Sequence, residues 1–217
     1  MTTEIINTLS SILETNPTSI SFKSVGGGSI NQCYKIDTEK KSFFCKLNQS
    51  ENFPDLFVKE KSGLDTLALQ RVIRVPLVKS VFSYNGTQVL LMEWIEQGKK
   101  TDSFWNLFGE QLARLHHVTS IKYGFDEDNY MGALPQSNNY ADEWIDFFVR
   151  HRLMPQIKIA VDNRLLNSDH VTHFERLFKQ LPQLLSPEPA SLLHGDLWSG
   201  NFLCDDRGYP VLVDPAV

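Results

Sequence analysis

The alternation of hydrophobic and polar positions predicts a β-rich section early in the chain, preceded by a short helix. The helix is ended by Asn16-Pro17, and its apolar residues recur at helical spacing: Ile5, Ile6, Leu9, Ile12 and Leu13. Three short apolar runs then occupy residues 20–25, 30–37 and 40–48. These runs predict three strands, the first two of which are joined by a glycine-rich turn.

A second helix and a hairpin are predicted next. Apolar residues recur with a period of about 3.6 after residue 56, and Glu60 shares their side of the helix; they are Phe57, Leu64, Leu67 and Ala68. Residues 79–95 contain two β-rich runs around Asn85-Gly86, a pair that favours a tight hairpin because both turn positions prefer positive φ. The predicted order is therefore β-β-β-α-β-β.

From residue 101 onward the pattern becomes helical, and the polar segment 96–100 is the predicted boundary between a lobe of residues 1–95 and a lobe of residues 96–217. Three apolar stripes predict helix faces that pack into a core: Trp105, Phe108, Leu112 and Leu115; Trp144, Ile145 and Phe148; Val171, Phe174, Leu177, Phe178 and Leu181. Residues 122–140 have no period and predict a long ordered loop. A strand at 191–194, a loop at 195–201 and strands at 202–206 and 210–214 close the prediction.

Composition narrows the class of protein. Among the 217 residues, 41% are hydrophobic and 22% are charged, which is typical of a soluble globular protein. The formal net charge of -5 argues against general nucleic-acid binding, which needs a cationic surface. The start has no cationic leader, and no apolar run approaches the ~20 residues of a membrane span, so we expect a cytoplasmic protein without membrane partners. Cys33, Cys45 and Cys204 fit neither a disulfide framework nor a zinc pattern, and we expect reduced thiols.

Candidate chemistry is concentrated near residue 200, in the stretch HGDLWSGN and the later DPA. Asp196 and Asn201 are separated by a tight loop, and the predicted hairpin returns Asp214 to their side. Carboxylate and amide oxygens suit Mg²⁺, and a remaining carboxylate can deprotonate a hydroxyl. The spacing D-x-x-x-x-N also equals that of a kinase catalytic loop. The alternative interpretation is a polar turn whose side chains cap the backbone.

Features of the first lobe agree with the kinase interpretation. Gly26, Gly27, Gly28 and Ser29 lie between two predicted strands, where a loop without Cβ atoms can approach phosphates, although such a loop is also a common flexible turn. Lys46 lies on the third strand, and Glu60 lies on the inner side of the next helix. A strand lysine paired with a helix glutamate holds phosphates in kinases. Taken singly, each could be a solvated surface charge.

The sequence resembles the fructosamine kinase family (ketosamine-3-kinases), a branch of the aminoglycoside-phosphotransferase group. The resemblance covers nearly the whole chain and includes VGGGSINQCYKI, SFFCKLN, LLMEWI, LARLHH, LLHGDLWSGN and VLVDPA. The loop YGFDEDNYMGALPQSNNY, followed by a Trp, a Phe and Arg-Leu, distinguishes ketosamine kinases from other small-molecule kinases. The resemblance implies an α+β, protein-kinase-like bilobal fold, with an antiparallel β-sheet lobe that carries one helix and a mainly helical second lobe.

The resemblance also implies roles for individual residues, with ATP and Mg²⁺ as cofactors. Asp196 would be the catalytic base, Asn201 and Asp214 the Mg²⁺ ligands, Lys46 the phosphate-binding lysine and Glu60 its partner. The loop over the phosphates would comprise Gly26, Gly27, Gly28 and Ser29, and a hinge whose backbone binds adenine would comprise Glu93, Trp94 and Ile95. His194 is predicted to fix the loop through hydrogen bonds rather than to carry a proton.

The implied reaction is phosphorylation of the 3-hydroxyl of a fructosamine or ribulosamine, free or on a protein, which leads to deglycation. Trp198, Asn129, Gln136 and Asn138 are candidates for reading the sugar, and the alternative is that the asparagines only order an irregular loop. Other hypotheses are a kinase for an aminoglycoside, choline or homoserine, and an inactive nucleotide-binding fragment. The sequence does not predict the natural amine or the oligomeric state.

Two departures from the family pattern bear on these expectations. Ser29 stands where many members have cysteine, so thiol regulation at that point is not expected, and Cys33 lies beyond the loop. The family continues past DPA with further helices, whereas this sequence stops at Val217. A fragment or a shortened gene product is therefore expected.

Overall fold

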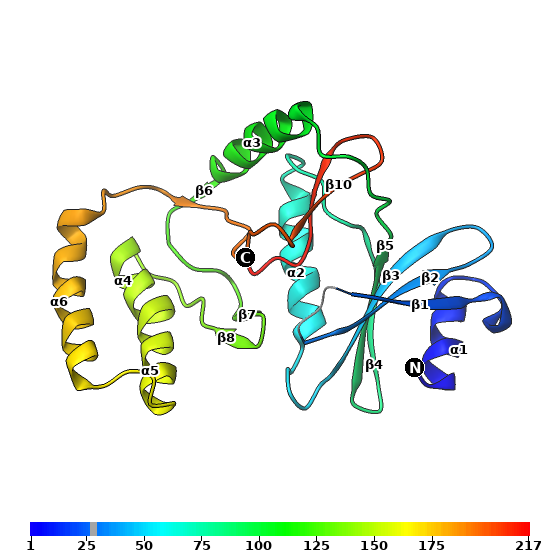
Figure 1. Ribbon diagram of the computed structural model, residues 1–217, viewed down its shortest axis with the longest axis horizontal. Helices are drawn as coiled ribbons and strands as arrows, with labels where there is room; N and C mark the ends of the chain where they lie inside the picture. Colours follow the sequence, from blue (N-terminus) through cyan, green and yellow to red (C-terminus); the bar gives the residue numbers. More distant parts are fainter. Residues whose placement is uncertain (27–29) are drawn as a thin grey trace.

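A five-stranded antiparallel sheet forms the first half of the molecule in the computed structural model, which describes residues 1–26 and 30–217 (Figure 1). The strand order is β1-β2-β3-β5-β4, with bounds β1 Ser21–Val25, β2 Gln32–Asp37, β3 Ser42–Gln49, β4 Val78–Tyr84 and β5 Thr87–Glu93. All five strands were predicted from the sequence. Gly27, Gly28 and Ser29 of the predicted phosphate loop lie outside the described residues.

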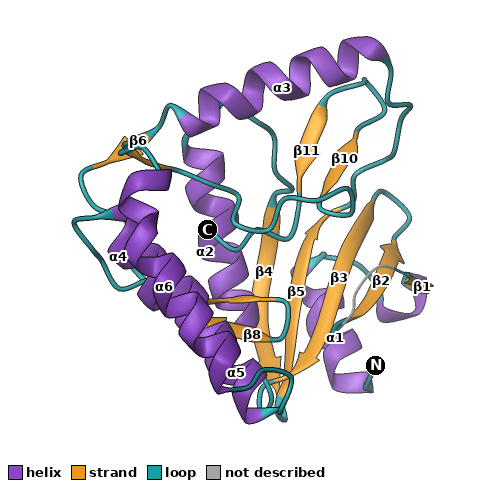
Figure 2. Ribbon diagram, turned by 60° about the vertical axis from the view of Figure 1, so that its left-hand side comes forward, coloured by secondary structure: helices purple, strands orange, loops and turns teal. Residues whose placement is uncertain are grey.

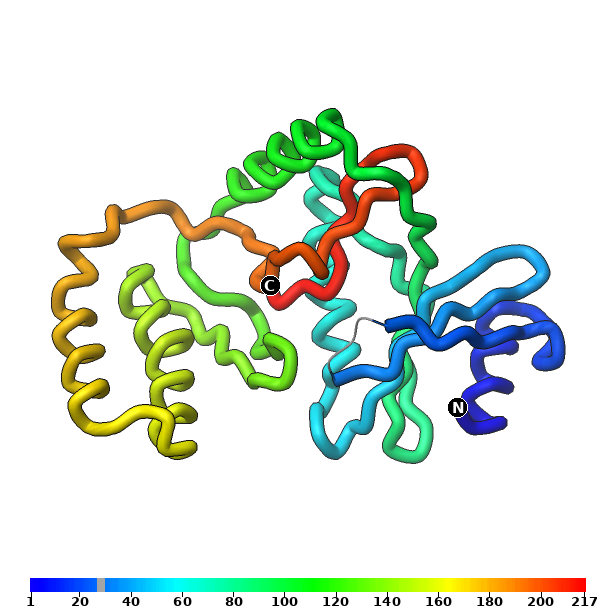
Figure 3. Tube along the Cα trace, in the orientation of Figure 1, coloured from blue at the N-terminus to red at the C-terminus, as the bar shows by residue number. Residues whose placement is uncertain are grey.

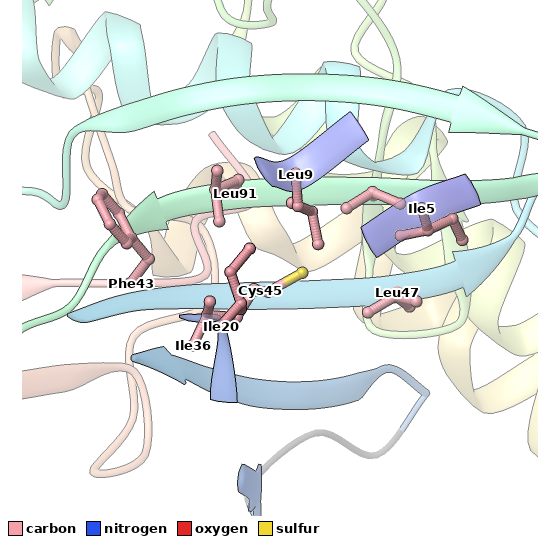
Figure 4. Close-up of a cluster of buried hydrophobic side chains, with 9 residues drawn as sticks. Ile5, Leu9, Ile20, Ile36, Phe43, Cys45, Leu47 and Leu91 are labelled. Atoms are coloured by element: carbon pink, nitrogen blue, oxygen red, sulfur yellow. The ribbon is translucent and has the colours of Figure 1, made fainter. Parts of the chain in front are cut away.

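Helix α1 (Thr3–Ile12) covers one face of this sheet. The side chain of Thr2 accepts a hydrogen bond from the Ile5 amide and so caps the first turn. The buried side chains of Ile5 and Leu9 pack against Cys45, Leu91 and other residues of the sheet (Figure 4). This cluster fixes α1 on the sheet face that lies away from the candidate site.

Helix α2 (Leu56–Leu69) covers the opposite face, as the arrangement of α1, α2 and the strands in Figure 2 shows. Its Leu56 and Phe57 pack against Leu90 and Met92 of β5. Side chains of a strand alternate between the two faces, so Lys46 of β3 lies on the α2 side while its neighbour Cys45 faces α1. The alternation of side chains along β3 therefore directs Lys46 toward α2.

The second half is mainly helical, and its helices extend away from the sheet (Figure 1). They are α3 Asp102–His116, α4 Trp144–Phe148, α5 Met154–Asp162 and α6 Ser168–Leu184, with a π-helical turn at Val149–Leu153 between α4 and α5. In the first half, a 3-10 turn at Pro17–Ser19 follows α1. Thr101 caps α3, and Asn167 forms a capping box with His170 at the start of α6. The described residues contain no helix long and apolar enough to cross a membrane.

Two predictions about extended segments were wrong. Residues 122–140 are not a loop throughout, because β7 (Asn129–Met131) pairs with β8 (Leu134–Gln136) around a turn at Gly132, where φ is +59°. The predicted strand at 191–194 is reduced to β9 (Ala190–Ser191), which pairs with β6 (Thr119–Ser120). The pairing ends there because β6 is two residues long, with a last bond from the Leu192 amide to the Val118 carbonyl at 2.8 Å, and the chain then turns at Gly195, whose φ is +82°.

The last two strands are also shorter than predicted: β10 is Phe202–Cys204 and β11 is Pro210–Leu212. Asp214 ends the extended run because its φ of +56° lies in the left-handed region. This conformation is uncommon for a residue with a Cβ atom, and such outliers are found preferentially at functional sites.

The apolar stripe of α6 is only partly buried, contrary to its prediction as a core face. Leu181 is buried, but 38% of Leu177 is exposed, and Trp105 on the stripe of α3 is 49% exposed. In α3, Phe108 and Leu115 of the predicted stripe are buried, and Phe104 joins them in place of Trp105. In α4 the buried residue is Phe147, which lies outside the predicted stripe. Helical periodicity therefore located the buried sides only approximately, and it could not show how much of each side the rest of the chain covers.

The β10–β11 hairpin joins the two halves of the molecule, and Figure 3 shows it beside the segment that leaves the sheet. The Gly98 amide donates to the Cys204 carbonyl at 2.9 Å, and the Leu212 amide donates to the Arg74 carbonyl at 2.9 Å. A Cβ atom on Gly98 would lie 2.2 Å from the Asp205 carbonyl oxygen, so this approach requires glycine. The division into lobes at residues 95 and 96 stays a prediction.

Candidate active site

The centre of the candidate site is the ammonium group of Lys46, which lies between two carboxylates. Its Nζ is 2.7 Å from Glu60 Oε1 and 2.6 Å from Asp214 Oδ1. Strand β3 supplies the lysine, α2 supplies the glutamate, and the segment after β11 supplies the aspartate. The predicted Lys46–Glu60 pair is therefore present, and the structure adds Asp214 to it.

Burial and charge act in opposite directions on this cluster. Burial raises the pKa of Glu60 to about 6, against the opposing effect of the Lys46 charge. Burial by itself would lower the pKa of Lys46, but the two carboxylates together outweigh it and raise that pKa. Lys46 therefore stays protonated at neutral pH, as a lysine that binds phosphate must.

The loop of residues 195–201 brings Asp196 and Asn201 into direct contact. Asn201 Nδ2 donates to the backbone carbonyl of Asp196 at 2.8 Å and to Asp196 Oδ2 at 3.0 Å. The Val213 amide donates to the Asn201 carbonyl at 3.0 Å, which places Asp214 next to this loop. Asp196, Asn201 and Asp214 thus gather at one place, as the sequence predicted.

His194 is a structural hydrogen-bonding residue in this arrangement, and it is 1% exposed. Its Nδ1 accepts from the Asp196 amide, so Nε2 carries the proton and donates to the Val213 carbonyl at 2.9 Å. Burial lowers the pKa of His194, which keeps the ring neutral at pH 7. The residue ties the loop of residues 195–201 to Val213, which follows β11.

We expect His194 to make the stability of the protein depend on pH. Its folded pKa is lowered, so the unfolded chain binds more protons below about pH 6.5, and the contribution of His194 is present above that pH and is lost as the pH falls. Urea unfolding should show that this loss is smaller in His194→Gln, by at most about 1.4 kcal/mol per pH unit. The exposed His173→Gln is the control. Equal pH slopes in wild type and His194→Gln would contradict the assignment.

Gly195 permits the closest backbone approach in the site. With φ at +82°, an added Cβ would lie 1.9 Å from the carbonyl oxygen of Ala216, whose amide donates to the His194 carbonyl at 2.8 Å. The loop and the segment after Asp214 are therefore in direct backbone contact. A side chain at residue 195 has to separate them.

Gly195→Ala is expected to destabilise the protein by more than the conformational cost of its positive φ. The matched control is Gly208→Ala, since Gly208 has a φ of +88° but has nothing within 4 Å of an added Cβ. The control should cost about 1–2 kcal/mol, and Gly195→Ala should cost more and also lower nucleotide binding. Equal losses in chemical denaturation would show that the close approach does not matter.

The donor set of the site fits a hard divalent cation. Asp196, Asn201 and Asp214 offer carboxylate and amide oxygens, and the side chain of Asp214 is 42% exposed. With Lys46 and Glu60 included, the ionised cluster carries an excess of negative charge that a cation would offset. The described residues include no cluster of three or more His, Cys, Asp or Glu side chains arranged for a metal. This is compatible with Mg²⁺, which takes few protein ligands and completes its shell with water and phosphate.

The predicted hinge follows β5. Ile95 is buried, and the indole nitrogen of Trp94 donates to Glu96 Oε2 at 2.9 Å. The carboxylate of Glu93 forms an ion pair with Arg74, a residue that no motif had indicated. The assignment of the hinge backbone to adenine stays a prediction, but the structure gives the Glu93 side chain a partner of its own.

Comparison with known proteins gives the family of the chain. The fructosamine kinase family model matches residues 1–217. A Synechocystis sp. protein that carries the name "Probable ketoamine kinase" is 40% identical to this chain over 195 residues. These residues cover 89% of this chain and 65% of that protein. The chain belongs to the fructosamine kinase family.

Solved structures agree with this assignment. A crystal structure from Haemophilus somnus named as a fructosamine-3-kinase has a TM-score of 0.83 and 27% identity, and the match covers 98% of this chain and 71% of that one. An aminoglycoside phosphotransferase in complex with ADP and hygromycin B has a TM-score of 0.64 at 14% identity, with 98% of this chain and 70% of that one covered. The second likeness shows the fold alone, and together they confirm the predicted protein-kinase-like α+β fold.

The amide side chains in and just after the β7–β8 hairpin have partners inside the protein. Asn129, Gln136 and Asn138 are buried, and their side-chain nitrogens donate to the Val217 carbonyl, to the Ala216 carbonyl at 3.4 Å and to the Glu127 carbonyl at 3.0 Å, respectively. These contacts support the alternative that the amides order irregular chain. Direct contact with a sugar stays a prediction for all three.

Trp198 is the exposed member of the predicted substrate set, with 60% of its surface accessible. An added Cβ on Gly200 would lie 2.4 Å from the Trp198 ring, so Gly200 allows the ring to fold back over the loop. The ring is therefore available for stacking beside Asp196, although its contact with substrate is also still a prediction.

Three functional candidates were missed by sequence reasoning: Arg74, Asp205 and Arg152. Arg152 donates to the Ser137 carbonyl at 2.7 Å and to Asn138 Oδ1 at 2.6 Å, and so supports the β7–β8 hairpin. The segment Asp205 to Gly208 carries a turn signal that could have identified the Asp205 side chain as a turn cap. No local signal marks Arg74.

The three cysteines are free and buried, which agrees with the prediction of unpaired thiols. Cys33 lies opposite Lys46 in the β2–β3 register, close to the site. Burial raises the pKa of the Cys33 thiol despite the nearby Lys46 charge, so the thiol stays protonated. Its position gives no support to a reactive thiolate.

Proposed function

We propose that this protein transfers the γ-phosphoryl group of ATP to a hydroxyl of a ketosamine, as a step in protein deglycation. The observation that carries the proposal is the position of Lys46 Nζ between Glu60 and Asp214, beside the joined Asp196 and Asn201. This is the set of groups by which kinases hold phosphates and accept the hydroxyl proton. The name of the Synechocystis relative supports a ketoamine as the acceptor.

Each residue has a defined part in this mechanism. Asp196 accepts the proton of the substrate hydroxyl while the oxygen of that hydroxyl bonds to the γ-phosphorus. The bond between the γ-phosphorus and the β-phosphate oxygen breaks, and ADP leaves. Lys46 binds the phosphates, and Glu60 orients Lys46. Asn201 and Asp214 would hold Mg²⁺, which supplies charge neutralisation for the phosphates. Because the residues are fixed by backbone contacts, the protein contributes mainly position.

Turnover of fructosyl-lysine and ribulosyl-lysine by the purified protein with ATP and Mg²⁺ tests the proposal. An aminoglycoside, choline and homoserine form the comparison panel. Faster phosphorylation of a ketosamine than of every other compound is the expected result. Turnover of an aminoglycoside without turnover of either ketosamine would overturn the proposal.

The chain spans 65% of the length of the Synechocystis relative, so the activity of the chain itself has to be measured. Binding of Mg·ATP without turnover would favour the second candidate, an inactive nucleotide-binding fragment. The exposed stripe of α6 favours this candidate, because a partly uncovered helix gives the second half of the protein a weaker core. A cytoplasmic location is part of the proposal and agrees with free thiols.

A further inference from the structure

Arg74 lies in the connection between α2 and β4 and makes two ion pairs that extend in different directions. Its NH1 is 2.6 Å from Asp205 Oδ2 in the turn of the β10–β11 hairpin, and its NH2 pairs with Glu93 Oε1 at the end of β5. The guanidinium therefore links the hinge to the hairpin. No residue role described above for the reaction includes Arg74.

The Asp205 end of this link is buried. Only 4% of the Asp205 side chain is exposed, while its other oxygen accepts from the Arg207 amide at 3.1 Å and from the Tyr209 amide at 2.8 Å. A buried carboxylate without a cation is costly, so Arg74 stabilises the charge while Asp205 shapes the turn. The planar guanidinium has two donor edges and can hold two carboxylates at once, which a lysine cannot do with the same geometry.

The backbone reinforces the same connection. Arg74 forms a parallel bridge with Val211, and its carbonyl accepts from the Leu212 amide at 2.9 Å. The hairpin that it holds follows Asn201 directly and is followed two residues later by Asp214, and these two residues are the candidate metal ligands. A shift of the hairpin relative to the hinge would change the distance between the metal ligands and the adenine site.

We propose that Arg74 is a positioning residue that sets the candidate metal ligands at the correct distance from the hinge, so that Mg²⁺ and the nucleotide base bind cooperatively. The inference rests on the proposed function only in taking the hinge and the Asn201–Asp214 pair as parts of one nucleotide site. It assigns to the Glu93–Arg74–Asp205 cluster the coupling between these parts. Such coupling is a free energy shared between two binding events.

The test measures the dissociation constant of ADP by calorimetry, with and without Mg²⁺. In wild type, Mg²⁺ should strengthen ADP binding. In Arg74→Gln this enhancement should fall by about tenfold, within the usual range of coupling between sites, while Mg²⁺-free ADP binding changes less. A general loss of folded protein would weaken both constants equally and leave their ratio unchanged.

A second variant protects the test against misfolding. Arg74→Gln combined with Asp205→Asn removes both charges, and the asparagine oxygen can still accept from the Arg207 and Tyr209 amides. This variant should unfold near the wild-type temperature and should also lose the Mg²⁺ enhancement. The control is Arg114→Gln, which removes an exposed pair with Glu110 on α3 and should leave the ratio unchanged.

Glu93→Gln completes a double-mutant cycle with Arg74→Gln. The two changes should lower the Mg²⁺ enhancement non-additively, because they break one link. The proposal would be overturned if the ratio of the ADP dissociation constants without and with Mg²⁺ stayed at the wild-type value in Arg74→Gln and in Arg74→Gln with Asp205→Asn. It would also be overturned if Mg²⁺ did not strengthen ADP binding in wild type. No ketosamine is used, so failure of the protein to phosphorylate a ketosamine contradicts the proposed function and leaves this test intact.

Discussion

Asp196→Asn is expected to lower kcat for ketosamine phosphorylation by about 10²- to 10⁴-fold, the usual contribution of a positioned general base. Asparagine has nearly the same shape and can retain a contact with the Asn201 amide, which in wild type lies 3.0 Å from Asp196 Oδ2. The loss should therefore fall on the chemical step, and Mg·ADP affinity should change little. Steady-state kinetics and calorimetry on the same preparation measure the two effects.

Asp206→Asn is the matched control for this substitution. Asp206 is exposed in the β10–β11 turn, in the same part of the chain, and its change should leave kcat near wild type. Normal turnover by Asp196→Asn would remove Asp196 from the role of base. A parallel loss of Mg·ADP affinity would instead indicate that Asp196 acts mainly by ordering Asn201.

Lys46→Met is expected to weaken Mg·ATP binding and to lower kcat by about 10²- to 10³-fold, comparable with the loss of one donor to developing charge. The side chain of Lys46 is 3% exposed, and its removal leaves Glu60 and Asp214 without their shared cation. Because Glu60 is also largely buried, the free energy of unfolding should fall by up to about 3 kcal/mol. Chemical denaturation and nucleotide titration measure the two effects separately.

Two further variants separate the loss of stability from the loss of activity. Lys46→Met with Glu60→Gln removes the stranded buried charge, so stability should return toward wild type while activity stays low. Lys61→Met, which breaks an exposed pair with Asp65 on the same helix, should change neither property appreciably. Full activity of Lys46→Met would contradict the phosphate-binding role.

The sheet and its two covering helices were predictable because their signals are local. Alternation in residues 42–49 places Lys46 and Cys45 on opposite faces, and Asn85-Gly86 specifies the β4–β5 turn. The β7–β8 hairpin was missed because its strands are three residues long and carry no alternation. The strand at 191–194 was predicted too long, since its pairing with β6 extends over two residues and depends on where residues 119 and 120 lie, which its own apolar residues do not show.

The site was predictable where a role depends on residue type at a fixed spacing. Asp196 and Asn201 lie five positions apart on one loop, and this spacing together with the tight loop between them predicted that they meet. The Arg74 cluster could not be predicted in this way, because Arg74 and Asp205 are 131 positions apart and pair only after the hairpin has folded against the α2–β4 connection. The burial of the β7–β8 amides likewise depends on where residues 216 and 217 lie.

The sequence by itself determined the strand faces, the existence of most helices and the motifs that carry the family and its candidate catalytic groups. These depend on local periodicity, turn chemistry and spacing, which are properties of neighbouring residues. Only the tertiary structure decided that Lys46 is shared between Glu60 and Asp214, that Gly195 contacts the Ala216 backbone and that Arg74 joins the hinge to the hairpin. The reason is that each of these contacts unites segments distant in the chain, and their distances are set by packing of the whole fold.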